Sequence, residues 1–555
     1  MKLEQIDTLV AGDFPEIGKP SGFYSGRAGA ITAVAGTFGH LWWPARVLDD
    51  GQRLLYRLCV YGAHGERLAL YDKLRFPIND VAIHPTLPLI AIACGRYDGG
   101  MFFEGELLLF DWEQNTVFSV LQSREVTRCR FSEAGDELML LLHPVSDEDF
   151  DWDFEKAINT FYGCTLPVNE LYPAPSQEAL LRWPDPQLDT SIPTAPSKLG
   201  FSSGIVRHEN PGASIREWAA ARAKIFEERH HVWDMTWLPD GRLACLHSGC
   251  LVELLDIDNT GHIALSVPKQ VERDSTADDF QSIQLHFSPV LKELVVHVVD
   301  FSSDDFTKRK SILYHIGISG EVKACEEFEV PFTFTWSADD SCLARNTETR
   351  EYPQGETALL ISPDGKASPL VIGHYDCFNH YIRLDGGRSL YFLQGTPPES
   401  HKGKYLCCLD PMHATWSRLW PVDMRTNADS HAMQLDGCLV QNDRLALAWI
   451  DYDPKPSHIY GSVACCELSS GRFVWQRPIK SQVVSMAYME AANVIACAFA
   501  DGNLQVYDAA DGCMLYSEEM IVNDIPAVPI SLAVQGNQLA VGTLDGRVVL
   551  YRLTS

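Results

Sequence analysis

A short hairpin pattern recurs along this 555-residue chain and limits its possible folds more than any other feature. Near the end, DGNLQVYDAADGCMLY (Asp501–Tyr516) joins a tight Asp-Gly turn, an alternating strand and a Tyr-Asp exit, and DGRVVLYRL (Asp545–Leu553) nearly repeats it. Shared glycines recur at intervals of 40 to 48 residues, in the pairs Gly65–Gly105, Gly355–Gly403, Gly461–Gly502 and Gly502–Gly546. The chain is therefore an array of small β-units rather than a set of unrelated domains.

Four short strands per unit at this period predict an all-β fold made of propeller blades. Ten units begin near Ala45, Asn79, Val126, Val232, Ser282, Pro331, Phe378, Ala432, Val483 and Pro526. The last unit supplies three strands, so we expect the strand AITAVAG (Ala30–Gly36) to complete it and close one large ring. Because ten exceeds the usual four to eight blades, two smaller rings remain an alternative.

The units resemble the WD40 family and its looser relatives. Gly39-His40 and Gly373-His374 are similar to the family's opening Gly-His, and Tyr71-Asp72, Phe110-Asp111 and Tyr507-Asp508 to its closing aromatic-Asp pair. Pro239-Asp240-Gly241 approaches its turn. The resemblance is degenerate in every unit, and it implies a propeller fold that serves as a non-enzymatic protein interaction scaffold.

The predicted organisation has four parts. Residues 1–36 form an N-terminal segment with the closing strand, 37–170 hold blades 1–3, 171–231 are an insertion, and 232–555 hold blades 4–10. The insertion begins rich in proline and ends in a predicted helix, with a capping box at Ser214 and Glu217. Its apolar side (Ile215, Trp218, Arg222 and Phe226) either packs on the propeller or docks a partner.

Charge and cysteine usage narrow the class of protein. With 45 Lys and Arg against 74 Asp and Glu, the net charge of -29 would repel nucleic acid. No signal sequence or membrane-length apolar stretch is evident, and many of the 16 cysteines lie in apolar strands, as Cys94 and Cys497 do. These features predict a cytoplasmic protein with reduced thiols.

Long loops on one side of the predicted blades supply the candidate partner-binding residues, since aromatic and arginine side chains dominate protein interfaces. The candidates are Arg96, Tyr97, Phe102, Phe103, Asp149, Trp152, Trp218, Tyr352 and Tyr452.

One of these loops carries the segment SDEDFDWDFE (Ser146–Glu155), which alternates carboxylates with aromatic residues. If it is extended, carboxylates line one side and aromatic rings the other, which suits a partner with a basic or apolar docking segment. A solvated acidic loop and a cation site are the alternatives for this segment.

Catalytic signatures are missing from the sequence: it has no G-x-S-x-G, Walker, G-x-G-x-x-G or H-E-x-x-H motif. His374, Cys377 and His380 lack a fourth metal ligand, so we predict no metal, cofactor or catalytic residue. The alternatives are a hydrolase or lactonase-like propeller enzyme with a channel site, or a ligand-sensing subunit of a larger complex.

Overall fold

The computed structural model describes residues 2–9, 13–38, 56–98, 101–122, 124–173, 193, 195–201, 210–247, 251–256, 262–266, 283–300, 310–346, 358–373, 382–395, 404–422, 431–441, 443–452 and 460–554. All structural statements concern these residues. They fall into two compact units. We call the one with Met1–Val10 and His230–Ser555 the seven-sheet unit, and the one with Ala11–Phe38 and Gln52–Arg229 the three-sheet unit.

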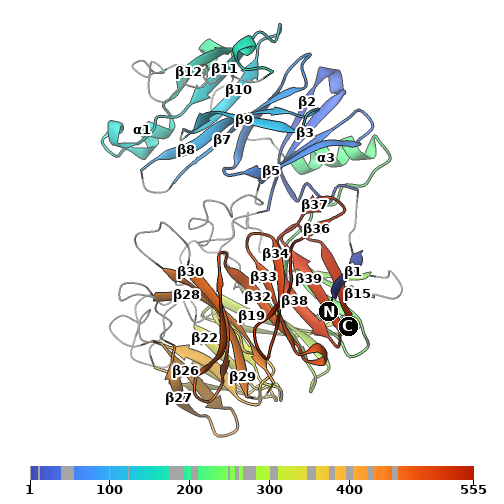
Figure 1. Ribbon diagram of the computed structural model, residues 1–555, viewed down its shortest axis with the longest axis vertical. Helices are drawn as coiled ribbons and strands as arrows, with labels where there is room; N and C mark the ends of the chain where they lie inside the picture. The colour runs from blue at the N-terminus through green and yellow to red at the C-terminus, as the bar shows by residue number, and fades with distance from the viewer. Residues whose placement is uncertain are drawn as a thin grey trace. The chain divides into compact units, whose positions relative to one another are not determined.

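The seven-sheet unit consists of antiparallel sheets of three or four strands (Figure 1). Its sheets are β13 (Val232–Trp237), β14 (Leu243–His247), β15 (Leu251–Leu255) and β16 (His262–Ser266); β17 (Gln284–Ser288), β18 (Glu293–Asp300), β19 (Lys310–Gly317) and β20 (Val322–Phe328); β21 (Phe332–Trp336), β22 (Cys342–Asn346), β23 (Ala358–Ile361) and β24 (Ala367–Leu370); β25 (Leu390–Gln394), β26 (Tyr405–Asp410) and β27 (Thr415–Pro421); β28 (His431–Val440), β29 (Arg444–Tyr452), β30 (Tyr460–Glu467) and β31 (Phe473–Ile479); β32 (Val483–Met489), β33 (Val494–Phe499), β34 (Asn503–Asp508) and β35 (Met514–Glu519); and β38 (Pro529–Gln535), β39 (Gln538–Thr543), β40 (Val548–Thr554) and β1 (Lys2–Leu9). A 3-10 turn, η8 (Glu490–Ala492), and a small hairpin of β36 (Ile521–Val522) and β37 (Ile525–Pro526) lie between strands.

The three-sheet unit contains β2 (Lys19–Gly26), β3 (Ile31–Thr37), β4 (Tyr56–Tyr61) and β5 (Arg67–Leu74); β6 (Ile78–Ile83), β7 (Leu89–Tyr97), β8 (Phe103–Asp111) and β9 (Thr116–Gln122); and β10 (Val126–Phe131), β11 (Glu137–Leu142) and β12 (Tyr162–Pro167). Its helices are α1 (Phe154–Ile158) and α3 (Pro211–Ala220), with 3-10 turns η1 (Arg27–Gly29), η4 (Glu148–Phe150), η5 (Val168–Glu170) and η6 (Pro196–Leu199). No helix among the described residues of either unit is long and apolar enough to cross a membrane.

Neighbouring sheets of the seven-sheet unit share apolar cores, because each inner strand alternates its side chains between two faces. The first strands of neighbouring sheets lie side by side, as β28 does with β32 and β32 with β38. The succession returns to its start, since Val232 and Leu243 of the first sheet share a core with Ala540 and Leu550 of the last. Seven sheets therefore lie in one compact unit and three in the other. The prediction above was a single ring of ten units, with two smaller rings as the alternative.

The strand that completes the last sheet is β1, which pairs with β40 from Lys2↔Thr554 to Leu9↔Val548 (Figure 1). The prediction that Ala30–Gly36 supplies this strand is wrong. That segment lies in β3, which is buried and pairs with β2 on one side and β4 on the other. A strand with two partners and two apolar faces belongs inside a sheet, whereas the mostly exposed β1 suits an outer position.

In the three-sheet unit, the sheet of β6 lies between the other two, since β6 contacts both β2 and β10. Segments of the insertion contact both outer sheets. Helix α3 packs beside β2 (Figure 1), and Phe201 lies under the guanidinium groups of Arg128 and Arg130 on β10.

Helix α3 begins earlier than the predicted capping box. Its N-cap is Asn210, whose side chain accepts a hydrogen bond from the backbone N–H of Ala213 at 3.0 Å, and Pro211 occupies the first turn. Asparagine caps helices well and proline fits the first turn, so Ser214 falls inside the helix.

The apolar side of α3 packs on its own unit. Ile215 and Trp218 share a core with Tyr61 of β4, and Phe226 joins them from beyond the helix end. Arg222 covers the Trp218 ring at 4.5 Å and donates to the carbonyl of Ala63 at 2.8 Å. Of the two alternatives for this helix, these contacts are those of self-packing.

Two tryptophans tie outer strands of the seven-sheet unit to the next sheet. The indole N–H of Trp420 donates to the carbonyl of Leu468 at 2.8 Å, and that of Trp475 to the carbonyl of Ala509 at 3.0 Å. Each ring lies against a glycine with positive φ, Gly471 and Gly512 respectively, where a Cβ would approach the ring within 2.5 Å. These contacts repeat between successive sheets, as the sequence repeat implies.

Candidate functional site

The predicted loop residues that the structure brings together form one small region of the three-sheet unit. We call it the aromatic lobe: residues 143–161 with the facing strand ends at Tyr97 and 101–103. Phe102 bridges to Ser146, the N–H of Phe103 donates to the carbonyl of Val145 at 3.1 Å, and that of Asp147 to Met101 at 3.1 Å. These backbone contacts join the loop before β8 to the loop after β11, so the two loops form one structural element.

A buried aromatic base supports the lobe. Phe103 is 1% exposed, and its ring lies 5.0 Å from Tyr97 and 4.9 Å from His143. Phe154 of α1 stacks on Phe103 and contacts Tyr97 at 4.6 Å. Phe103 therefore belongs to the core, and its prediction as a partner-binding residue is wrong. The loop position suggested exposure, but the facing segment covers the ring.

His143 connects this base to the sheet and to α1. Its Nδ1 lies 2.8 Å from a carboxylate oxygen of Glu125, and its Nε2 lies 3.1 Å from the carbonyl oxygen of Ile158, the last residue of α1. Both partners are acceptors, so a ring N–H on either side of the imidazole has an acceptor within hydrogen-bond distance. Asn79 donates to the other oxygen of Glu125 at 3.0 Å.

Tyr97 and Asp147 join the two segments through a side-chain hydrogen bond. The Tyr97 hydroxyl donates to Asp147 Oδ2 at 2.8 Å, and this bond to a carboxylate raises the pKa of Tyr97 to about 12. The hydroxyl therefore keeps its proton at neutral pH and holds the carboxylate in place. Asp147 itself is buried, and its Oδ1 has no hydrogen-bond partner among the described residues.

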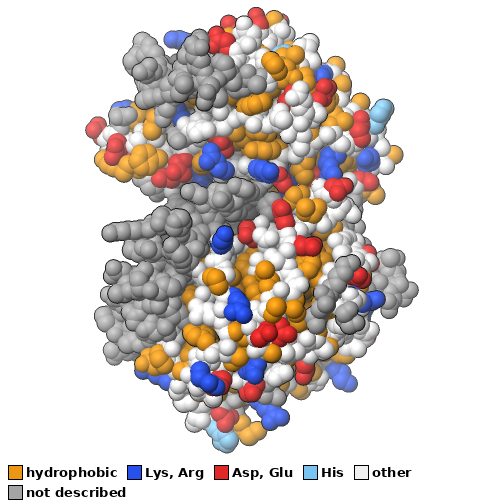
Figure 2. Space-filling model, viewed as in Figure 1, with side chains coloured by type: hydrophobic (Ala, Val, Ile, Leu, Met, Phe, Trp, Pro, Cys, Tyr) orange, Lys and Arg blue, Asp and Glu red, His pale blue; other side chains and the backbone are white. Residues whose placement is uncertain are grey.

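Two aromatic side chains of the lobe are exposed to solvent. Phe102 is 43% and Trp152 is 58% exposed, and Val145 is also exposed. Trp152 and the preceding Asp151 adopt left-handed backbone conformations, with φ of 64° and 58°, which are unfavourable for residues other than glycine. In Figure 2, hydrophobic and acidic side chains lie together where Figure 1 places α1 and β8.

The acidic segment is not extended as the sequence suggested. Residues 148–150 form the 3-10 turn η4, and α1 begins at Phe154 with Asp153 as its N-cap, whose carboxylate accepts from the N–H of Lys156 at 3.0 Å. Side chains alternate between two sides only in an extended segment. Because this segment contains a 3-10 turn and the start of a helix, its carboxylates do not line one side as the extended form would require. Asp149 lies within η4. Among the described residues there is no cluster of three metal-ligating side chains.

Trp218, Arg96 and Tyr452 are not among the residues that define the lobe, and Tyr352 lies outside the described residues. Trp218 is 9% exposed beneath Arg222, so its prediction as a partner-binding residue is wrong. Arg96 lies near the end of β7, opposite Glu104. Tyr452 ends β29. His374, Cys377 and His380 also lie outside the described residues.

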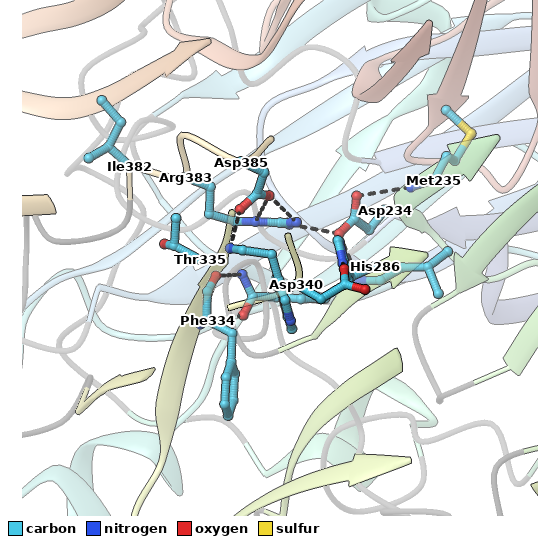
Figure 3. A network of polar contacts seen from close by, with 12 residues as sticks. Asp234, Met235, His286, Phe334, Thr335, Asp340, Ile382, Arg383 and Asp385 are labelled. Atoms are coloured by element: carbon cyan, nitrogen blue, oxygen red, sulfur yellow. Dashed lines mark hydrogen bonds and ion pairs between the residues drawn. The ribbon is translucent and has the colours of Figure 1, made fainter. Parts of the chain in front are cut away.

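Sequence reasoning missed a polar network in the seven-sheet unit, centred on Arg383 (Figure 3). Its guanidinium donates to Asp234 Oδ2 at 2.7 Å and to Asp385 Oδ2 at 2.9 Å, while Asp385 accepts from the N–H of Trp336 at 2.9 Å. Burial disfavours the charged guanidinium, but the two carboxylates outweigh it and hold the pKa of Arg383 above its usual value. The network joins two sheets, through Asp234 on β13 and Trp336 on β21, to the segment that precedes β25.

The network is part of a repeated link between first strands. Asp234 on β13 accepts from the N–H of Leu285 on β17 at 2.8 Å, and Gln284 on β17 accepts from the N–H of Phe334 on β21 at 2.8 Å. In the three-sheet unit, Asp80 on β6 accepts from the N–H of Cys129 on β10 at 3.1 Å. In each of these three pairs, a side chain on the first strand of one sheet accepts a hydrogen bond from a backbone N–H of the next sheet.

A side chain also links the last sheet to the first, but with the opposite direction of donation: the Ser531 hydroxyl donates to the carbonyl of Val232 at 2.6 Å. A sequence signal for these links exists. Asp80, Asp234 and Asp436 are isolated acidic residues within the first strands of their units, and each follows a β-bulge. An acid inside an apolar strand needs a specific partner, which is the clue that the sequence offered.

The comparisons with known proteins agree with repeated blades. A family model described as outer membrane protein assembly factor BamB matches residues 408–555. No curated protein matches the chain. That match and the repeated four-stranded sheets identify a β-propeller.

Solved structures give weaker likenesses. One chain of a mitotic checkpoint complex is 13% identical with a TM-score of 0.39, covering 59% of this chain and 89% of that chain. The Cps50 (Swd1) β-propeller domain of Myceliophteria thermophila is 13% identical with a TM-score of 0.40, covering 59% and 98%. Virginiamycin B lyase from Staphylococcus aureus is 9% identical with a TM-score of 0.39, covering 59% and 95%. We draw no conclusion about activity from them.

Proposed function

We propose that this β-propeller protein is a non-enzymatic protein interaction scaffold that docks a partner on the aromatic lobe. The observation that carries the proposal is the pair of exposed rings, Phe102 and Trp152, held above a buried aromatic base. Large aromatic side chains on a rigid support are the usual anchors of protein interfaces, because they bury much area at little cost in conformational entropy.

The proposal also includes ring closure and the WD40-like character of the blades. The seven sheets form a closed propeller, with β1 completing the last blade, and the repeat units are degenerate WD40-like blades. The return of the packing from β38 to β13 supports closure. We place the protein in the cytoplasm, since Cys94 and Cys497 are buried free thiols of raised pKa, which suit a reducing compartment.

No specific observation on the described residues favours the alternatives, a channel enzyme or a ligand sensor. The most conspicuous polar group of the seven-sheet unit, Arg383, is engaged by Asp234 and Asp385. Two charged neighbours with good geometry are what a structural link requires.

The test is affinity capture from native extract with the full chain and with the double substitution Phe102→Ala/Trp152→Ala. Both side chains are exposed, so the variant keeps its thermal stability while losing a stoichiometric partner. The control is Met412→Ala, an 83% exposed side chain in the seven-sheet unit, which keeps the partner. Equal capture by all three proteins would refute docking on the lobe.

A further inference from the structure

We propose that the partner reaches the aromatic lobe with a basic segment, whose arginine or lysine side chain lies over the ring of Trp152. This inference rests on the proposed function and names the chemistry of its partner. The lobe offers the two features that such a segment needs: an exposed aromatic face and a surrounding negative charge.

The aromatic face is Trp152, the most exposed of the large apolar side chains of the lobe. Tryptophan is the side chain that best attracts a cation over its ring. The same unit already uses this contact internally: Arg222 covers Trp218 at 4.5 Å, and Lys156 lies 5.7 Å from the ring centre of Phe150. Trp218 is buried under its cation, whereas Trp152 presents its ring to solvent.

The negative charge is concentrated around that ring. The segment 147–156 contains six acidic residues and one lysine, Lys156. Glu148, Asp151, Asp153 and Glu155 are exposed, and Asp147 lies buried beneath them. An exposed, mainly negative surface raises the association rate of a positively charged partner and disfavours binding of an acidic one.

The exposed apolar side chains specify the rest of the segment. Phe102 and Val145 come from the two paired loop segments of the lobe, so apolar residues beside the cation would find contact area there. A basic segment with interspersed apolar residues therefore fits better than a purely basic one. Anionic nucleic acid and anionic lipid surfaces are disfavoured by the same carboxylates.

The experiment measures fluorescence anisotropy of a short labelled peptide, in which arginine alternates with leucine and glycine, titrated with the full chain. We expect saturable binding that weakens as salt rises. Trp152→Ala should reduce the affinity about tenfold or more. Glu148→Lys/Glu155→Lys should reduce it about five- to tenfold and flatten its salt dependence.

Matched controls separate the lobe from general charge attraction. Glu133→Lys/Glu519→Lys makes the same change in net charge at exposed positions elsewhere and should leave binding within about twofold. A peptide with glutamate in place of arginine should not bind. Circular dichroism and melting temperature establish that each variant is folded.

Failure of this inference differs from failure of the proposed function. Binding of the arginine peptide that is unaffected by Trp152→Ala, equal binding of the glutamate peptide, or no binding of either overturns the basic segment. If native extract still yields a partner that depends on Phe102 and Trp152, the scaffold proposal stands with a different partner chemistry.

Discussion

The two units complete the same repeated sheet in different ways. In the seven-sheet unit, the outer face of each sheet meets the next sheet, and side chains such as Asp234 and Ser531 link neighbouring first strands. In the three-sheet unit, α3 packs on one outer sheet, and Phe201 lies beside Arg128 of the other. A blade therefore needs an apolar cover and a partner for its buried donors, and a helix supplies the cover as well as another blade does.

The difference also bears on function. The three-sheet unit carries both helix α3, which packs on its sheet, and the aromatic lobe, on which we propose docking, all built from insertions. Both features use tryptophan: Trp218 is buried and Trp152 is exposed.

The largest effect is expected from removing the helix cover. Trp218→Ala deletes a ring packed 5.4 Å from Tyr61 and from Phe14, and should cost about 3–5 kcal/mol of the free energy of unfolding of the three-sheet unit. Urea unfolding followed by circular dichroism measures it. Trp152→Ala is the matched control and should change the free energy of unfolding by less than about 0.5 kcal/mol. Equal effects would show that α3 is not a structural cover.

The next effect is expected from breaking a link between sheets. Asp234→Ala leaves the Leu285 N–H without its acceptor and removes one carboxylate from Arg383, so we expect a loss of about 2–4 kcal/mol in the seven-sheet unit. Asp240→Ala removes an exposed ion pair with Arg242 in the same sheet and should cost less than about 1 kcal/mol. Similar melting temperatures for the two variants would contradict the role of the link.

A smaller effect is expected at the tryptophan contact between outer strands. Gly512→Ala places a Cβ 2.5 Å from the Trp475 ring, whereas Gly536→Ala meets nothing within 4 Å. Both glycines have positive φ, near 70° and 60°, so the backbone strain is similar and the difference isolates packing. We expect Gly512→Ala to be less stable than Gly536→Ala by about 1–3 kcal/mol in thermal unfolding. Equal losses would assign the effect to strain alone.

The pH dependence of the first-strand links should differ from that of surface carboxylates. Burial raises the pKa of Asp436 to about 6, against the lowering by its backbone donors and Arg383. The folded state therefore holds a proton that the unfolded state releases between about pH 4 and 6, and this stabilisation is lost as the pH rises through 6. Asp436→Asn cannot ionise, so its stability relative to the parent should grow by about 1–3 kcal/mol from pH 4 to 7.

Melting temperatures of the parent and Asp436→Asn across this pH range measure the effect. The control is Asp364→Asn, because the Ser362 hydroxyl lowers the pKa of that exposed carboxyl, which is the opposite direction. A constant difference between Asp436→Asn and the parent would refute a buried proton at this site.

The sequence was sufficient to predict the repeated units but not to predict which strand completes the last sheet. Eight of the predicted unit starts fall within about three residues of the starts of β6, β10, β13, β17, β21, β28, β32 and β38, because turn residues and alternating apolar strands are local signals. The closing strand depends on pairing between the two chain ends, which no local pattern reports. Ile31–Thr37 looks more like a strand than Lys2–Leu9 does, yet the latter takes the outer place.

Which side chains of the lobe are exposed was also only partly predictable, because exposure again depends on contacts between distant segments. Phe102 and Phe103 are neighbours in the sequence, but the bridge to Ser146 leaves Phe102 outward and Phe103 under the lobe. That contact joins segments more than 40 residues apart, so only the folded structure distinguishes the two rings. Asp234 and Asp436, by contrast, stand out in the sequence as acids inside apolar strands, but we did not predict their roles.

The measurement that tests the central claim most directly is hydrogen–deuterium exchange of the full chain, comparing Trp218→Ala and Asp234→Ala with the parent. The account predicts faster exchange in β2–β5 for Trp218→Ala with β38–β40 unchanged, and the reverse preference, toward β13 and β17, for Asp234→Ala. Faster exchange throughout both units in either variant would contradict the claim that each unit completes its sheets by itself.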